Sequence, residues 1–321
     1  MRPEPVGLLG FLVFAATAAA WGPAGAATPA DYWNDFQRAR FQEQVTTTLR
    51  IDNDSLLLNR NDGVYTSGVQ LIRAFRLDAG AAGPVPPAVS YGWRIGQELY
   101  TASDINLAPQ DVSPFDHPYA GWLYAGVMRE SALADGSHAR IGIDLGCLGP
   151  CALGRKTQET LHRILRQKLP QGWSQQVRNE PGVLLHADLA AARWQFGRNI
   201  DLAPSLQGRV GNIHTDVAGS LLLRAGQLDA DAAAPAWQGS MRVQARAVGY
   251  DATLQGGYFS KDNARVVTPK RLVGEAEIGF SWRYRRHQLS AAVVRRGSEI
   301  AALSNARGAQ NFVRLELVVT P

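Results

Sequence analysis

The chain has 321 residues, of which 45% are hydrophobic and 19% are charged. This composition is too apolar for a disordered tail and too poor in charge for a coiled coil. Lys and Arg together number 33 and Asp and Glu 28, so the net charge is only +5, a weak signal for nucleic-acid binding at this length.

Residues 1–27 have the organisation of a secretory signal peptide. Arg2 supplies the positive start, residues 6–21 are almost wholly apolar, and Ala24-Gly25-Ala26 has the small-x-small form of a cleavage site. An uncleaved membrane anchor is the alternative, but the apolar stretch is short and the tail rich in Gly, Pro and Ala is typical of a cleavable leader. The sequence therefore predicts an exported protein whose mature part begins near residue 28.

No later window reaches the ~18 uninterrupted apolar residues that a transmembrane helix requires. The mean hydropathy of −0.16 fits a soluble protein and a membrane barrel equally well, because barrel strands alternate polar and apolar positions. Periodicity separates these two possibilities.

Residues 272–284 alternate along the chain, with Ile278 and Phe280 on one parity and Glu275 and Glu277 on the other. Similar segments recur through the mature chain and predict twelve strands. They lie at 45–52, 65–77, 88–99, 119–131, 138–148, 182–194, 199–208, 216–226, 238–250, 271–284, 287–298 and 311–319.

A soluble β-sandwich also alternates, but runs of ten or more residues are long for a sandwich. An even number of strands is typical of single-chain bacterial barrels. The sequence therefore predicts an all-β fold, a twelve-stranded antiparallel transmembrane β-barrel formed by residues 28–321. Arg73 and Arg295 do not follow the alternation of their strands.

One long connection, residues 149–181, interrupts the strands and is expected to carry an α-helix over 154–168. Helix formers fill this stretch, and Pro170 and Gly172 end it. Leu161, Ile164 and Leu165 share a stripe that is expected to dock on the protein and to direct His162 along the same surface.

His162 lies four residues after Gln158, so the two side chains share one face of this helix. A neutral imidazole near a carbonyl substrate can act as a base, and the alternative is a structural histidine. At the end of the first strand, the oxygens of Asn53 and Asp54 suit a hard cation such as Ca²⁺, or simply a polar turn. Alternation places these two on opposite sides, so both contribute to one site only if the strand bends or ends there.

Ser55 follows in an Asn-Asp-Ser-Leu run that superficially resembles a Gly-Asp-Ser-Leu hydrolase block. The first glycine and the downstream Asp-x-x-His are missing, and no G-x-S-x-G occurs, which argues against a serine nucleophile. Cys147 and Cys151 can form a small disulfide at the mouth of the helical loop in an oxidising compartment. A lone pair of cysteines lacks the four ligands of structural zinc.

Several short blocks within residues 50–225 point to one known family. They are Asn53-Asp54, 65–68, 96–101, 118–124, 144–150, Gln158-x-x-x-His162, 170–173, 179–182 and 211–212. In this order they resemble the outer-membrane lipid A 3-O-deacylases. The last hundred residues are similar to that family only as general barrel strands.

The resemblance implies a twelve-stranded barrel whose active site lies between the wall and a helix of an extracellular loop. It implies calcium-assisted removal of the 3′-linked acyloxyacyl group from lipid A of lipopolysaccharide, with His162 activating water. Asp54 and Thr66 are then expected beside Ca²⁺, and Asn53 and Gln158 in supporting catalytic roles. The expected setting is the bilayer of a Gram-negative outer membrane, with a monomeric protein and no nucleic acid.

The chain departs from the family pattern at several positions. His117 stands where an arginine is expected between Asp116 and Pro118, and Lys168 stands where relatives can carry an acid six residues after the histidine. The chain also ends in Pro321 rather than in the aromatic residue typical of barrels. Two alternatives stay open, a non-enzymatic pore or structural barrel and a serine-dependent outer-membrane phospholipase.

Overall fold

The computed structural model describes residues 29–42, 44–57, 64–77, 88–132, 135–230 and 234–321. The predicted signal peptide, residues 1–27, lies outside these ranges. Among the helices within them, none combines the length and the apolar character needed to cross a membrane.

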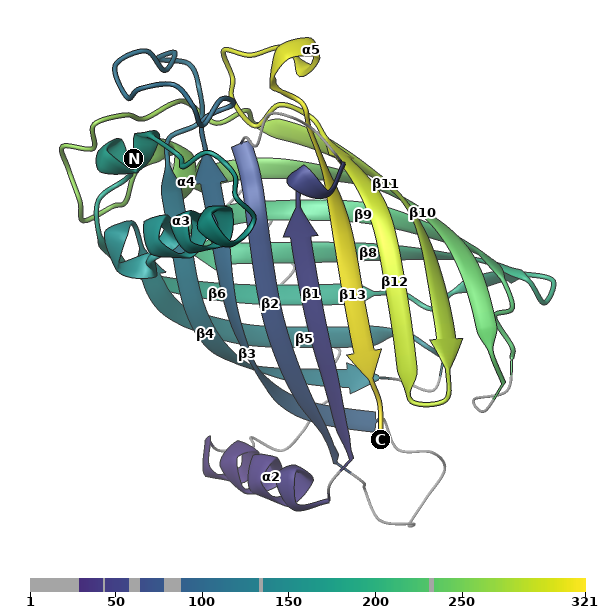
Figure 1. Cartoon of the computed structure of the whole chain (residues 1–321). Helices are drawn as coiled ribbons and strands as arrows, with labels where there is room; N and C mark the ends of the chain where they lie inside the picture. Colours follow the sequence, from purple (N-terminus) through teal and green to yellow (C-terminus); the bar gives the residue numbers. More distant parts are fainter. Residues whose placement is uncertain (1–28, 43, 58–63, 78–87, 133–134, 231–233) are drawn as a thin grey trace.

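The described chain folds into a closed antiparallel barrel (Figure 1). Thirteen strands form one sheet, and all except the three-residue β7 make up the wall. The first strand pairs with the last, and β6 pairs with β8, which closes the cylinder. The strands are β1 (Val45–Asn53), β2 (Val64–Leu77), β3 (Ala88–Thr101), β4 (Ala120–Ala132), β5 (His138–Leu148), β6 (Glu180–Ala190), β7 (Trp194–Phe196), β8 (Ile200–Gly211), β9 (His214–Gly226), β10 (Ala236–Asp251), β11 (Leu272–Tyr284), β12 (His287–Arg296) and β13 (Gln310–Val319). The predicted twelve-stranded barrel is confirmed.

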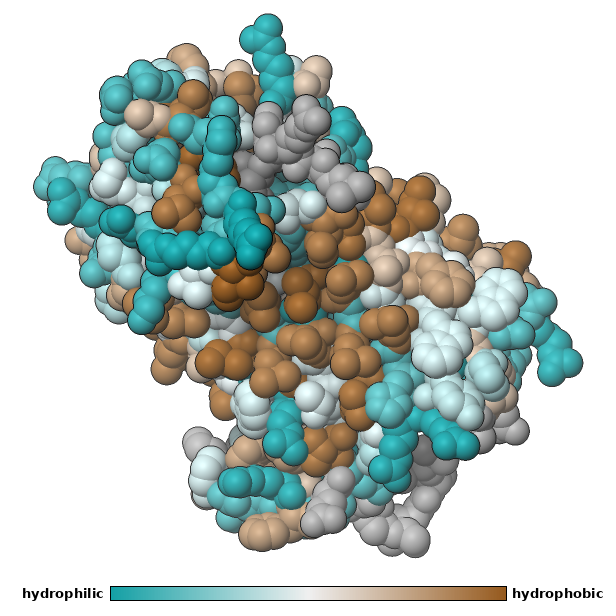
Figure 2. All heavy atoms as spheres, viewed as in Figure 1, coloured by the Kyte–Doolittle hydropathy of each residue, from teal (hydrophilic) through white to brown (hydrophobic). Residues whose placement is uncertain are grey.

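Side chains of the wall alternate between the outer surface and the lumen. On β11, Ile278 and Phe280 are exposed on the outside, whereas Glu275 accepts a 2.8 Å hydrogen bond from Arg296 and Glu277 a 2.7 Å bond from Arg314. Figure 2 shows the resulting apolar surface across the middle of the barrel. Because hydrocarbon cannot solvate charge, the ionic side chains are directed inward and pair with one another.

The two arginines that break the alternation lie toward the ends of their strands. The guanidinium of Arg73 lies 5.8 Å from the ring centroid of Phe75, and Arg295 donates a 3.0 Å hydrogen bond to Asn311. A long arginine stem can cover apolar surface while its head reaches the aqueous boundary. Both residues therefore fit the barrel despite facing outward.

The two ends of the barrel differ in their connections. One end carries long loops with η1 (Ser55–Leu57), η2 (Pro150–Ala152), α3 (Gly154–Ile164), η3 (Gly172–Gln175), α4 (Ala252–Gln255) and α5 (Asn305–Gly308). The opposite end carries shorter connections, among them the two-residue turn between β11 and β12, together with the C-terminus and α2 (Pro29–Phe41) (Figure 1). Long extracellular loops and short periplasmic turns are typical of outer-membrane barrels, so α3 marks the extracellular end.

The helix α2 is a feature that the strand pattern does not predict. Its Phe36 ring meets Phe75 of β2 edge-on at 6.0 Å, and its Asp35 accepts a 3.1 Å hydrogen bond from the Tyr91 hydroxyl of β3. Ala39 is fully buried in the same contact. The helix is thus anchored on the outside of the wall, at the periplasmic end.

The helix α3 corrects two predictions. It ends at Ile164 rather than at residue 168, because Arg166 adopts a left-handed backbone with φ of 56°. The stripe expected to dock is turned outward: Leu161 is 42% exposed and Ile164 72%. The buried face is instead the one that carries Gly154, Gln158 and His162.

The close approach of α3 to the wall depends on Gly154. A Cβ placed at this position would lie 2.7 Å from Trp173 and 2.9 Å from Leu99 of β3. Only glycine allows the first turn of the helix to sit this near the strand. Because Gly154 is on the same face of α3 as Gln158 and His162, its contact with the wall places this polar face inside and leaves the apolar stripe outside.

Candidate functional site

The first part of the candidate site is the extracellular end of β1. The strand ends at Asn53, whose Oδ1 accepts hydrogen bonds from the Ser55 hydroxyl and, at 3.2 Å, from the Leu56 N–H. Its Nδ2 donates to the Thr66 carbonyl at 3.3 Å. Both ends of the Asn53 amide are therefore used to shape the turn that presents Asp54, which is only 4% exposed.

Thr66 lies beside this turn, at an irregularity of β2. The register of β2 against β3 shifts between Tyr65 and Ser67, as at a β-bulge. The Thr66 hydroxyl lies 2.7 Å from the hydroxyl of Thr101, the last residue of β3, and both side chains are buried. We call Asn53, Asp54, Thr66 and Thr101 the strand-end group.

The second part of the site is the buried face of α3. Gln158 and His162 lie one turn apart on this face and are 3% and 4% exposed. Gln158 Oε1 accepts a 2.7 Å hydrogen bond from the indole N–H of Trp173, while its Nε2 has no hydrogen-bond partner among the described residues. A buried amide N–H₂ in this state is a donor available to a ligand or to water.

The ring orientation of His162 is set by the backbone. Its Nδ1 lies 2.6 Å from the carbonyl oxygen of Lys168. Because a carbonyl can only accept, Nδ1 carries the hydrogen, and in the neutral ring Nε2 then holds an unprotonated lone pair. The position where relatives can carry an acid thus contributes its main-chain oxygen here, whatever its side chain.

The two parts of the site meet at β3. Thr101 contacts Thr66 of the strand-end group, and two residues earlier Leu99 packs in one cluster with Trp173, the partner of Gln158. One turn before α3, the Ala152 carbonyl accepts a 2.7 Å hydrogen bond from Gln97 of β3. The end of this strand therefore positions both groups of predicted site residues at the extracellular rim of the wall (Figure 1).

The predicted disulfide is confirmed. Cys147 at the end of β5 is bonded to Cys151 in η2, with their Cα atoms 5.9 Å apart. The Cys151 N–H also donates a 2.8 Å hydrogen bond to Asn179 Oδ1. This linkage fixes the chain immediately before α3 to the wall.

Two residues, Glu180 and Arg265, tie the extracellular loops together through contacts that the sequence does not predict. Glu180 is fully buried and accepts hydrogen bonds from the backbone N–H groups of Tyr258, at 2.7 Å, and Ser260, at 3.0 Å. Arg265 donates to the carbonyls of Pro109 and Val112 at 2.6 and 2.9 Å. Their partners lie far away in the sequence, so no local pattern could have indicated these contacts.

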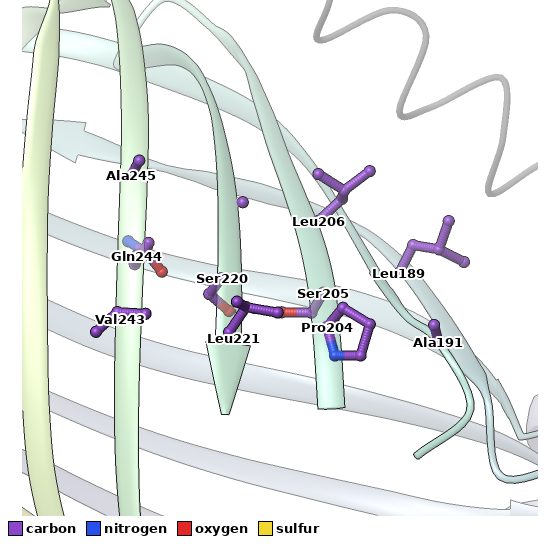
Figure 3. Close-up of a pocket in the computed structure, with 11 residues that line it drawn as sticks. Leu189, Ala191, Pro204, Ser205, Leu206, Ser220, Leu221, Val243, Gln244 and Ala245 are labelled. Carbon is purple, nitrogen blue, oxygen red and sulfur yellow. The ribbon is translucent and has the colours of Figure 1, made fainter. Parts of the chain in front are cut away.

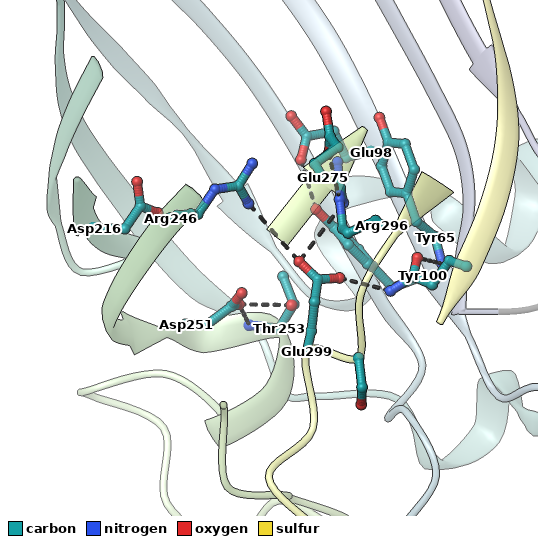
Figure 4. Close-up of polar contacts among 12 residues, drawn as sticks. Tyr65, Glu98, Tyr100, Asp216, Arg246, Asp251, Thr253, Glu275, Arg296 and Glu299 are labelled. Atoms are coloured by element: carbon teal, nitrogen blue, oxygen red, sulfur yellow. Dashed lines mark hydrogen bonds and ion pairs between the residues drawn. The ribbon is translucent and has the colours of Figure 1, made fainter. Parts of the chain in front are cut away.

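The lumen beneath the site is occupied by charged side chains (Figure 4). Arg296 donates to Glu275 at 2.8 Å and lies 3.6 Å from Glu299, which also accepts a 2.8 Å hydrogen bond from Gln310. The cavity left at this level measures about 180 Å³. Charged and polar side chains therefore line the lumen at this depth.

The oxygen atoms near Asp54 bear on metal binding. Within the part of the chain that the structure describes, no three His, Cys, Asp or Glu side chains gather as a metal cluster. The remaining donors of the strand-end group are one carboxylate, hydroxyls and backbone carbonyls. These are hard oxygen ligands of the kind Ca²⁺ accepts, and they are unlike the nitrogen and sulfur ligands of zinc.

Three solved structures are compared with this chain, and the first of them shares its fold. The chain superposes on LpxR from Salmonella typhimurium with a TM-score of 0.69 at 19% identity, covering 85% of this chain and 99% of the other. The β domain of the Bordetella autotransporter BrkA gives 0.44 at 12% identity, with coverages of 86% and 98%. The translocator domain of NalP from Neisseria meningitidis gives 0.43 at 10% identity, with coverages of 96% and 98%.

Comparison with curated proteins finds no match. The sequence model of the family described as outer membrane protein LpxR matches residues 9–320, which is nearly the whole chain. This agrees with the blocks that resemble the lipid A 3-O-deacylases. The chain therefore belongs to the LpxR family of outer membrane proteins.

Proposed function

We propose that the protein is a deacylase of the outer membrane that hydrolyses the ester holding the 3′-linked acyloxyacyl group of lipid A. Family membership supports the reaction class. The single structural observation that carries the proposal is the buried pair on α3, in which His162 is oriented by a carbonyl and Gln158 presents an amide N–H₂ group without a partner among the described residues. A base and an oxyanion donor on one helix face are the minimum for ester hydrolysis by water.

His162 is the general base. With the hydrogen on Nδ1 held by the Lys168 carbonyl, Nε2 takes a proton from the attacking water as its oxygen bonds to the ester carbonyl. The imidazolium then returns the proton to the leaving alkoxide of the sugar. The carbonyl of Lys168 keeps the ring in place through both steps.

Gln158 stabilises the oxyanion. The indole N–H of Trp173 occupies Oε1, so the amide is oriented with its N–H₂ group toward the site. A donor held in this way requires no reorganisation when charge develops on the ester oxygen. Asn53 acts as a positioning residue, since both ends of its amide are engaged in the turn.

A calcium ion held by Asp54 and Thr66, with backbone and water oxygens, would supply positive charge that further favours the oxyanion. The burial of Asp54 supports this role, because a buried carboxylate is stabilised by a nearby cation.

The substrate approaches along the outer face. The apolar stripe of α3, formed by Leu161, Ile164 and Leu165, is exposed. An apolar surface extends across the middle of the barrel (Figure 2). Acyl chains of a membrane lipid can pass beside such a surface without entering water. The stripe that was expected to dock on the protein is thus suited to contact with lipid.

The two alternatives have less support. Arg296, Glu275 and Glu299 pair with one another inside the lumen, where a pore would need open space for solutes (Figure 4). Ser55 donates its hydroxyl to the Asn53 side chain and serves the turn, which does not favour a serine nucleophile.

The test is mass spectrometry of lipid A from cells that express the protein. Wild type is expected to remove the 3′ acyloxyacyl mass, His162→Ala to leave lipid A intact, and a chelator to block the wild type. His287→Ala, a matched change at an exposed histidine of β12, is expected to behave as wild type. Full deacylation by His162→Ala would refute the assignment of the base.

A further inference from the structure

A hollow lies between α2 and the outer face of the wall, at the end opposite the candidate active site. Tyr32, Trp33 and Phe36 of the helix form one side. The other side is formed by outward-facing residues of neighbouring strands, among them Val127 of β4 and Leu185 of β6. The volume is about 490 Å³, within the range of about 300–1,000 Å³ that is usual for small-molecule sites.

The hollow is continuous with the lipid-facing surface of the barrel. Val127 is 56% exposed and Leu185 42% exposed on the outside of the wall, and Trp33 is 60% exposed on the helix. Side chains of this kind on a barrel exterior are in contact with hydrocarbon, and Trp and Tyr collect at its boundary. The space between them therefore opens to the membrane.

A positive charge stands at the rim of this hollow. The guanidinium of Arg129 lies 5.9 Å from the ring centroids of both Tyr32 and Tyr91, and its Nε donates to the Tyr91 hydroxyl at 3.4 Å. The last turn of α2 carries Arg38, which is paired with Asp35, and the exposed Arg40; neither lines the hollow, so Arg129 is the cation that the proposal uses. A guanidinium group next to an apolar cavity matches a molecule that carries a phosphate on a hydrocarbon chain.

We propose that this hollow is a binding site for one glycerophospholipid of the periplasmic leaflet. An acyl chain fills the space between Trp33 and Val127, and the phosphate lies against Arg129. The helix α2 then acts as a clamp that holds the lipid on the wall. The site is separate from the candidate active site, and its occupant is a lipid that the protein retains.

A second hollow on the wall provides a comparison. It measures about 590 Å³ and is lined by strand residues such as Leu206, Leu221 and Val243 (Figure 3). It has an apolar lining on the lipid side, and among the residues that the structure describes no helix and no charged side chain contributes to it. Ordinary exchangeable membrane lipid is sufficient to cover such a surface.

The experiment uses the full chain reconstituted in bilayers that contain phosphatidylethanolamine with a photoreactive diazirine in its acyl chain. After irradiation and digestion, lipid adducts are expected to be several-fold more abundant on peptides containing Trp33 or Val127 than on peptides containing Val243. Val127→Trp, which fills the proposed site, is expected to reduce the α2 adducts to the level of the Val243 peptide. Val243→Trp, which fills the second hollow, is expected to leave the α2 adducts unchanged.

Arg129 gives an independent readout. After delipidation in detergent, native mass spectrometry is expected to find phospholipid retained by wild type and by Arg129→Lys, and lost from Arg129→Gln. Lipid A deacylation should persist in Val127→Trp, so failure of the lipid site is distinguishable from failure of the proposed enzyme. Equal labelling of α2 and β10, or chain-to-chain adducts in place of lipid adducts, would overturn the proposal.

Discussion

The contact between Trp173 and Gln158 allows the oxyanion assignment to be tested by a double-mutant cycle. Gln158→Leu keeps the approximate size of the side chain and removes the N–H₂ donor. Trp173→Phe removes only the indole N–H that holds Gln158 Oε1 at 2.7 Å. If Trp173 acts through Gln158, the second change is expected to have no further effect on the rate in the Gln158→Leu background.

The expected loss of rate differs between the two single variants, because they remove different hydrogen bonds. Loss of an oxyanion donor is expected to lower kcat by about 10²–10³-fold. Loss of the neutral hydrogen bond from Trp173 corresponds to about 0.5–1.5 kcal/mol and hence to a decrease of roughly 2- to 13-fold. Gln158→Leu also leaves the buried Trp173 N–H unsatisfied, at about 1–3 kcal/mol of stability, so adding Trp173→Phe should recover stability without recovering activity.

The assay is the rate of release of the acyl group by purified protein in mixed micelles. Heat-modifiable gel migration of all four proteins establishes that each barrel is folded. Additive losses, in which the double variant is slower than Gln158→Leu by the full Trp173→Phe factor, would show that Trp173 does not act through Gln158. A wild-type rate for Gln158→Leu would remove Gln158 from the oxyanion site altogether.

Further predictions concern the base, the metal and α3. Lys168→Ala is expected to keep the deacylation rate within about 0.5 kcal/mol of wild type, because His162 uses only the main-chain carbonyl; a large loss would show that the lysine side chain takes part. Asp54→Asn is expected to raise the Ca²⁺ concentration for half-maximal activity roughly tenfold or more, as measured in calcium-buffered assays; an unchanged requirement would exclude Asp54 as a ligand. The hydrogen bond from Arg155 lowers the pKa of Glu159 below its ordinary 4.5, so the contribution of this pair to α3 is present above pH 4.5 and is lost as pH falls through the lowered pKa. Protection factors of the α3 amides, which are corrected for the pH dependence of intrinsic exchange, should fall slightly across that range in wild type and stay level in Glu159→Gln, because Arg155 is exposed.

The barrel could be predicted because alternation is a local signal. Within each strand, the alternation of apolar and polar residues indicates which side chains face lipid, as Ile278 and Glu277 do on β11. Once these faces are known, antiparallel pairing of strands that follow one another in the chain is the expected arrangement. An even number of wall strands allows β1 to pair antiparallel with β13, as observed. The helix α2 gave no comparable signal, since it is held by Phe75 and Tyr91, which are far from it in the sequence.

The error over α3 has a physical cause. In a soluble protein, a row such as Leu161, Ile164 and Leu165 is stabilised by facing the core. At the surface of a membrane protein the same apolar row can remain exposed. The face of the helix that forms hydrogen bonds with the rest of the protein is then the buried one. Gln158 and His162 were placed on one face correctly, but their polar partners, Trp173 and the carbonyl of Lys168, are contributed by the irregular chain after the helix.

Closure of the cylinder relates the site to biogenesis. The strand that presents Asp54 is also the one that meets the final strand, and this seam is fastened by Arg314 to Asp52 at 2.9 Å and by Arg50 to Glu316 at 2.6 Å. A chain whose last strand has not yet been delivered leaves β1 as an open edge, with Asp52 lacking its arginine partner. The proposed active site should consequently be complete only once the last strand is in place, because the turn that presents Asp54 follows directly on this seam.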